Sequence, residues 1–148
     1  MDPTTTGADV TTTAVAPTSA TDASPDGTSP DNSVSCGWWV DVGFKHYSLL
    51  HTTIYAWHHK VVYCLIWNQQ ITSWQARFDF MSYASSVVDV GSLTANSQWG
   101  LHSMRAYSFK QRHVQLCVVK YGCYANLYPH SEIWVGAVGR WGYSGGAT

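Results

Sequence analysis

The sequence predicts an all-β domain, an antiparallel sandwich or a partly closed barrel of about eight short strands, with a disordered N-terminal tail. Residues 34–148 are rich in Val, Ile, Thr, Tyr and Trp, which suit a pleated, half-buried surface. Several runs in that part alternate apolar and polar residues, and no long helical period competes with them. These observations predict one β domain over residues 34–148.

The tail covers residues 1–33 and has the opposite composition. It holds nine Thr, four of the five Pro and five Asp, and it has no aromatic residue. Such a segment cannot bury enough apolar surface to offset the conformational entropy that ordering it would cost. We therefore expect it to be a disordered spacer rather than part of the domain core.

The expected strands come from runs of β-forming residues between turn signals. The run 61–67 is apolar at nearly every position, which indicates a central strand covered on both faces. The polar segment 110–112 is typical of a hairpin turn, and the segment 91–102, rich in Gly, Ser, Asn and Gln, is typical of a long loop. The predicted strands are Gly37–Val42, Thr52–His59, Val61–Trp67, Ile71–Phe80, Ser86–Val90, Met104–Lys110, Arg112–Val119 and Glu132–Val138.

Two alternating runs predict which side chains enter the core. In 73–80 the even-numbered residues, from Trp74 to Phe80, form the expected core face, and the odd-numbered residues form the solvent face. In 113–118 the even-numbered residues Val114, Leu116 and Val118 are expected to point inward. Tyr55, Trp57 and His59 are expected to share one face of their strand, as residues two apart do.

Four cysteines in this short domain favour an oxidising environment and two disulfides. Three pairings are open from the sequence. We favour Cys117 with Cys123, which closes a tight turn at Gly122, and this leaves Cys36 to pair with Cys64. A zinc site is less well supported, because the chain has no Cys-x-x-Cys pair with a His partner.

The cysteines predict an extracellular or cell-surface location, although residues 1–30 show no export signal. No membrane span is expected, because the longest apolar run, Val61–Trp67, is far shorter than the roughly 20 residues that a helical span needs. The eight Lys and Arg residues all follow residue 33, and four acidic residues accompany them, so the domain charge is +4. They form no basic stripe, and nucleic acid is therefore not an expected partner.

Motifs for catalysis, metals or cofactors are weak. Gly142-Tyr-Ser144-Gly-Gly146 matches a nucleophile pattern but has no following helix, so we expect a flexible terminus and no catalytic residue there. His58 and His59 should point to opposite faces of a strand and cannot chelate one ion together. The pair His130 and Glu132 suits a salt bridge at a strand edge. The sequence predicts neither a metal site nor a cofactor.

Aromatic content is the main pointer to function. Trp38 and Trp39 must project to opposite faces, so at least one of them lies outside the core or under a second layer. Exposed aromatic side chains in a domain with little charge suit stacking on sugar rings or contact with a protein surface. The candidate binding residues are Trp39, Tyr55, Trp57, Trp99, Trp141 and Tyr143.

Several segments resemble a group of small secreted actinobacterial β-rich proteins of uncharacterised function. They are Ala56-Trp-His-His-Lys-Val-Val-Tyr-Cys64, Ile71-Thr-Ser, Cys117 with Tyr121-Gly-Cys123, and Tyr128-Pro129. The resemblance spans about residues 36–138. It implies secretion and disulfides, and it supplies no active site.

The leading hypothesis is a non-enzymatic secreted or surface-displayed binding domain for a glycan or protein surface, with the tail as a spacer. A structural or virion-type assembly subunit is the second class, because such tails also decorate assembled particles. A small secreted enzyme is the third, and it would need His and carboxylate side chains that converge in space.

Overall fold

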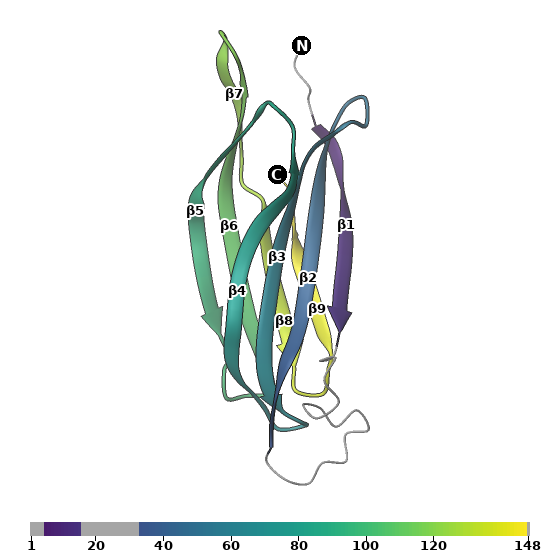
Figure 1. The fold of residues 1–148 in the computed structure, drawn as a ribbon, viewed down its shortest axis with the longest axis vertical. Coiled ribbons are helices and arrows are strands. Elements are labelled where there is room, and N and C mark those ends of the chain that lie inside the picture. The colour runs from purple at the N-terminus through teal and green to yellow at the C-terminus, as the bar shows by residue number, and fades with distance from the viewer. Residues whose placement is uncertain (1–4, 16–32, 148) are drawn as a thin grey trace.

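The computed structural model describes residues 5–15, by their backbone, and residues 33–147. Two antiparallel sheets pack face to face (Figure 1), which confirms the predicted all-β sandwich. The first sheet has the order β1-β2-β3-β4, and the second has the order β5-β6-β8-β9 with β7 paired to β6. Among the described residues, no helix is long and apolar enough to cross a membrane. The strands are β1 (Thr5–Val15), β2 (Val34–Ser48), β3 (Thr53–Ile66), β4 (Gln70–Ala84), β5 (Val88–Trp99), β6 (Arg105–Val118), β7 (Gly122–Leu127), β8 (His130–Gly136) and β9 (Trp141–Gly146).

Strand β1 falls within the segment predicted to be a tail. It pairs antiparallel with β2, from Thr5 opposite Ser48 to Val15 opposite Trp39. Its many Thr and Val residues are compatible with an extended, paired backbone. The rest of the predicted tail before Ser33, residues 1–4 and 16–32, lies outside the described residues.

Several predicted breaks between strands are wrong. Strand β3 continues through Lys60, and β6 continues through the expected turn at 110–112. Lys110 is only 3% exposed and points between the sheets, so its polarity marks an inward polar position and not a turn. Most of the expected loop 91–102 belongs to β5, and the Gly-rich segment 142–146 belongs to β9.

A β-bulge in β4 explains the largest error in the predicted core. Trp74 lies opposite Tyr63 and Ala76 lies opposite Val62, so Gln75 is an extra residue without an opposite partner in β3. A bulge of this kind shifts the two-residue alternation by one position. The faces predicted from the sequence are therefore correct before Gln75 and reversed after it.

The reversal moves two phenylalanines to the surface and two charged residues between the sheets. Phe78 and Phe80 were predicted to lie in the core, but they are 40% and 37% exposed. Arg77 and Asp79, predicted to face solvent, point inward and hydrogen-bond to residues of β6. In β6 the predicted inward face is confirmed at Val114 and Leu116, which are buried, while Val118 is half-buried.

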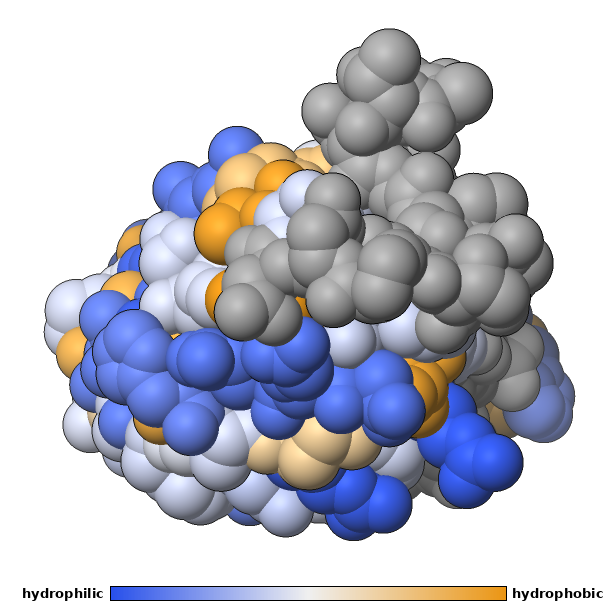
Figure 2. Space-filling view, turned by 90° about the horizontal axis from the view of Figure 1, so that it is seen from below, coloured by the Kyte–Doolittle hydropathy of each residue, from blue (hydrophilic) through white to orange (hydrophobic). Residues whose placement is uncertain are grey.

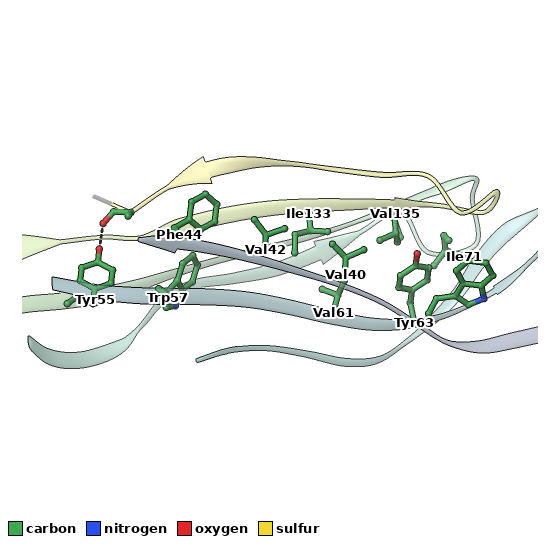
Figure 3. Close-up of a cluster of buried hydrophobic side chains, with 14 of the residues drawn as sticks. Val40, Val42, Phe44, Tyr55, Trp57, Val61, Tyr63, Ile71, Ile133 and Val135 are labelled. Atoms are coloured by element: carbon green, nitrogen blue, oxygen red, sulfur yellow. Dashed lines mark hydrogen bonds between the residues drawn. The ribbon is translucent and has the colours of Figure 1, made fainter. Parts of the chain in front are cut away.

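The core lies between the two sheets and is built mainly from β2 and β3 of the first sheet and β6 and β8 of the second (Figure 3). Tyr55, Trp57 and His59 are fully buried on one face of β3, which confirms the predicted stripe. The Tyr55 hydroxyl donates to the carbonyl oxygen of Ala147, so the last described residue is held between the sheets. The other core residues labelled in Figure 3 are Val40, Val42, Phe44, Val61, Tyr63, Ile71, Ile133 and Val135.

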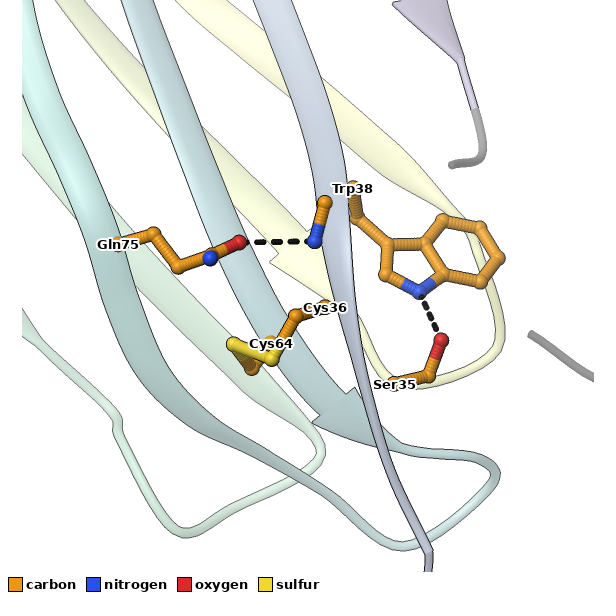
Figure 4. Close-up of a disulfide and its surroundings, with 6 residues drawn as sticks. Ser35, Cys36, Trp38, Cys64 and Gln75 are labelled. Carbon is orange, nitrogen blue, oxygen red and sulfur yellow. Dashed lines mark hydrogen bonds between the residues drawn. A yellow bond between two sulfur atoms is a disulfide. The ribbon is translucent and has the colours of Figure 1, made fainter. Parts of the chain in front are cut away.

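Both disulfides match the favoured pairing: Cys36 with Cys64 joins β2 to β3, and Cys117 with Cys123 joins β6 to β7. The first lies at a bulge in β2, where Gly37 has a φ of 85° that favours glycine. The Gly37 N–H donates to Oε1 of Gln75 at 2.8 Å, as Figure 4 shows. The two bulges are thus tied to each other, and the two disulfides fit an extracellular protein.

Two histidines are buried in this core without charge. His46 stacks on Tyr55 with ring centroids 5.0 Å apart, and His59 bonds to the Ser108 hydroxyl at 2.9 Å. Burial lowers the pKa of His46 to about 4. Burial, together with the nearby charges of Lys110 and Arg77, lowers the pKa of His59 to about 3. Both side chains are therefore neutral in the folded protein at pH 5.

We expect the protein to lose stability as the pH falls from 7 to 5. In the unfolded chain each histidine gains a proton below its ordinary pKa of about 6.5, whereas buried His46 and His59 do not. Above pH 7 both histidines are neutral in the folded and the unfolded chain, and the free energy of unfolding carries no penalty from them. By pH 5 the free energy of unfolding should be lower by about 2 kcal/mol for each histidine. Urea unfolding at pH 7, 6 and 5 measures it. The variant His59→Gln should reduce this pH dependence, whereas the control His51→Gln, at an exposed histidine, should leave it unchanged. Equal stability at pH 5 and pH 7 would contradict the expectation.

Candidate ligand-binding face

The outer face of the second sheet carries a row of aromatic side chains across its strands. Trp99 of β5 lies opposite Tyr107 of β6, which lies opposite Trp134 of β8, which lies opposite Gly142 of β9. Residues that are directly opposite in an antiparallel sheet project from the same face. Tyr107 lies between the buried Ala106 and Ser108, so this face is the outer one. We call Trp99, Tyr107 and Trp134 the aromatic row.

Two members of the row, Trp99 and Tyr107, stack on each other. The rings of Trp99 and Tyr107 are parallel within 4°, with centroids 5.1 Å apart. Trp99 is 45% exposed even though it makes this contact. Each ring restrains the other, so less side-chain entropy remains to be lost when a ligand packs against the exposed part of this stacked pair.

Trp134 lies flat on the sheet because β9 has a glycine opposite it. A Cβ atom at Gly142 would overlap Nε1 and Cε2 of the Trp134 indole, so a larger residue at that position would displace the indole. The guanidinium of Arg105 covers the indole, 3.9 Å from its ring centroid. This cation–π contact holds a positive charge at the edge of the aromatic row.

A small cavity of about 180 Å³ lies beside the row. Its walls include Met104 of the β5–β6 connection, Arg105 of β6 and Trp134 of β8. Val138 and Arg140 of the β8–β9 turn also contribute to them. The volume is below that of typical small-molecule pockets, so the cavity could take one substituent of a ligand that rests on the row. Figure 2 views the molecule from below, toward the end where this turn lies, and shows small hydrophobic patches separated by polar residues.

Polar groups flank the aromatic row on the next register line. Phe109 of β6 lies opposite Glu132 of β8, which lies opposite Ser144 of β9. Glu132 and Ser144 are therefore on the same outer face as Trp134. The serine of the motif at 142–146 thus contributes a hydroxyl group beside an aromatic surface. A hydroxyl, a carboxylate and a guanidinium are all available to hydrogen-bond a ligand there.

Of the six residues predicted from the sequence to bind a ligand, Trp99 belongs to the aromatic row. Trp39 lies on the outer face of the other sheet, where the Lys60 ammonium is 4.6 Å from its ring centroid. Trp141 packs against the core and Tyr143 contacts the edge of Phe44, both near the β9 edge. The prediction is corrected for the core residues in β3, Tyr55 and Trp57, because a fully buried ring cannot reach a surface ligand.

Sequence reasoning missed Tyr107 and Trp134. The signal was present in the alternation of Arg105, Tyr107 and Phe109 and in the alternation of Glu132 and Trp134. It was obscured because the strand around Tyr107 was expected to end at Lys110, and because the register between strands is not a local property of the sequence.

A second cluster lies between the sheets, where Asp79 of β4 meets Arg112 of β6. The Arg112 Nη2 donates to Asp79 Oδ1 at 2.9 Å, its Nε donates to Oδ2, and the Trp57 indole donates to Oδ2 at 2.8 Å. Burial raises the pKa of Asp79, but the hydrogen bonds from Arg112 and Trp57 and the nearby positive charges outweigh it and hold the pKa below its ordinary value. Asp79 is therefore a carboxylate with its partners supplied by the protein.

The remaining cations of this cluster also have internal partners. Arg77 donates to the Ser108 hydroxyl at 2.9 Å and to Asn96 Oδ1 at 2.8 Å, and Lys110 donates to the same Asn96 oxygen at 3.0 Å. The cluster thus joins β4 to β5 and β6 along one side of the sandwich. We assign it a structural role, because the hydrogen bonds that it makes are directed at residues of the same chain.

Comparison with protein-family models, with curated proteins and with solved structures finds no match. Among the described residues, no three His, Cys, Asp or Glu side chains gather as metal ligands.

Proposed function

We propose that this chain is a secreted or surface-displayed binding domain that binds a glycan on the outer face of the β5-β6-β8-β9 sheet. The aromatic row is the observation that supports the proposal. Ring faces attract the C–H faces of sugars, and Trp99, which stacks on Tyr107 and is 45% exposed, can offer such a face. The Arg105 guanidinium, which covers Trp134, lies on the same outer face and can hydrogen-bond a sugar hydroxyl. Glu132 and Ser144 lie beside it, where they could hydrogen-bond sugar hydroxyls.

Binding is expected to weaken roughly tenfold in the variant Trp99→Ala, because a stacked aromatic contact at a binding site is typically worth more than 1 kcal/mol. A panel of soluble neutral and acidic oligosaccharides, titrated while tryptophan fluorescence is followed, measures it. Trp39→Ala is the matched control, since it removes a partly exposed tryptophan from the opposite sheet. If no oligosaccharide binds, or if both variants lose the same affinity, the glycan proposal is contradicted.

A second candidate is an assembly subunit. It is favoured by the large apolar side chains exposed on two connections at one end of the sandwich (Figure 1). Leu50 in the β2–β3 connection is 88% exposed, and Val119 in the β6–β7 connection is 87% exposed. Such side chains suit contact with another protein surface. Sizing chromatography on the same samples tests it, because a monomer that persists at high protein concentration contradicts assembly.

A further inference from the structure

The outer face of the first sheet holds a chain of three side chains that lies apart from the aromatic row. His58 of β3 is central: its Nδ1 is 2.8 Å from Asp41 Oδ1 of β2, and its Nε2 is 2.9 Å from the Ser82 hydroxyl of β4. The His58 and Asp41 side chains are 20% and 22% exposed, and Ser82 is exposed. A small molecule can therefore reach the serine.

Ser82 occupies a special position in β4. Met81 lies opposite Trp57 and Tyr83 lies opposite Ala56, so Ser82 is the extra residue of a β-bulge. Bulges re-aim side chains, and here the bulge brings the Ser82 hydroxyl onto the same outer face as His58.

The hydrogen bonds select one tautomer of neutral His58. Ionised Asp41 can only accept a hydrogen bond, so the Nδ1 that faces it must carry a hydrogen. In neutral imidazole the other nitrogen then has a lone pair, and Nε2 accepts the hydrogen bond from the Ser82 hydroxyl. This is the arrangement in which a histidine can remove the proton of a serine.

Two exposed rings form an apolar surface next to this group. Phe80 stacks on the His58 ring with centroids 4.6 Å apart and an interplanar angle of 9°, and Phe78 lies 5.9 Å from Phe80 between centroids. An acyl chain or aromatic group resting on these rings would bring its carbonyl group near Ser82. The substrate class that fits is an ester with an apolar acyl group.

We propose that Ser82 is a nucleophile for acyl transfer, with His58 as its general base and Asp41 as the positioning residue. The Ser82 oxygen attacks the ester carbonyl while its proton passes to Nε2 of His58. The tetrahedral intermediate collapses, the bond to the leaving alcohol breaks, and the alcohol takes the proton from His58. Water then attacks the acyl-serine while its proton passes to Nε2 of His58. The bond between the acyl carbon and the Ser82 oxygen breaks, His58 returns the proton to that oxygen, and the carboxylic acid is released.

A fluorophosphonate probe tests the nucleophile on the whole chain, with intact mass and peptide mapping as readouts. One adduct is expected, on Ser82, and Ser82→Ala should remove it. Ser73→Ala is the matched control, because Ser73 is an exposed serine on the same face of β4 without a histidine bonded to it. With p-nitrophenyl acetate we expect a burst of p-nitrophenol of about one per chain.

Variants of His58 and Asp41 should slow the labelling of Ser82 to different extents. His58→Gln should slow labelling at least about 100-fold, the usual share of a general base. Asp41→Asn should slow it at least tenfold, since an amide no longer fixes the Nδ1 hydrogen, and Asp41→Glu should recover part of the rate. Unfolding midpoints of each variant separate these effects from loss of fold. Labelling of the unchanged chain that is no faster at Ser82 than at Ser73 overturns the proposal.

Discussion

Replacing Asp79 with asparagine is expected to lower the free energy of unfolding by about 3–5 kcal/mol, the usual cost of removing one member of a buried ion pair. The Asp79 side chain is 4% exposed, and it is the carboxylate that faces Arg112 and two further cations between the sheets. The amide has nearly the same shape, so the loss would come from charge and hydrogen bonding. Urea unfolding with linear extrapolation measures it.

The control for this change is Asp89→Asn on β5. Asp89 is exposed and carries the same chemical group, so its substitution should change stability by no more than about 0.5 kcal/mol. If Asp79→Asn stays within 1 kcal/mol of the unchanged chain, then the cluster between the sheets does not depend on a paired carboxylate.

Removal of the Cys36–Cys64 disulfide is expected to have the next largest effect. The bridge closes a loop between residues 28 apart, and the chain-entropy model gives a loss of about 3–4 kcal/mol for that separation. The double variant Cys36→Ala, Cys64→Ala removes the bridge without leaving a polar atom in place of the half-buried and buried sulfurs. Unfolding in urea, with both variant and parent under non-reducing conditions, gives the difference.

The second disulfide provides an internal comparison. Cys117 and Cys123 are only 6 residues apart, so the same model gives a smaller loss, about 2 kcal/mol, for the matching double alanine variant. A larger loss for this pair than for Cys36–Cys64 would contradict an explanation based on loop entropy.

The fold class, both disulfide pairs and the buried stripe of β3 could be predicted because each depends on local signals. Alternation placed Tyr55, Trp57 and His59 on one face, and they remain together in the core. The part of β5 after Val90 was mistaken for a loop because β5 is an edge strand of its sheet, and edge strands tolerate polar residues. Strand β9 was mistaken for a flexible terminus because the contact that explains Gly142, the Trp134 indole lying across it, comes from a different strand.

The candidate sites were largely beyond the reach of the sequence for the same reason. Trp99 was recognised as an unusual residue, but its contact with Tyr107 depends on the register between β5 and β6. Asp41, His58 and Ser82 come from three strands and are separated by up to 41 residues, as their numbers show. An extra residue in a strand leaves no local mark in the composition, so the bulges at Gln75 and Ser82 could not be anticipated.

The bulge at Gln75 also determines where the chain can change in length. Deleting Gln75 would leave Trp74 and Ala76 facing as they do now, because regular alternation already places neighbours in a strand on opposite sides. The loss would be the hydrogen bond from Gly37. Deleting Phe78 instead would reverse the direction in which every residue on one side of the deletion points. Their surface side chains would then turn inward and their interior side chains would turn outward. Natural insertions and deletions in β4 are therefore expected to be accepted at the bulges and rejected between them.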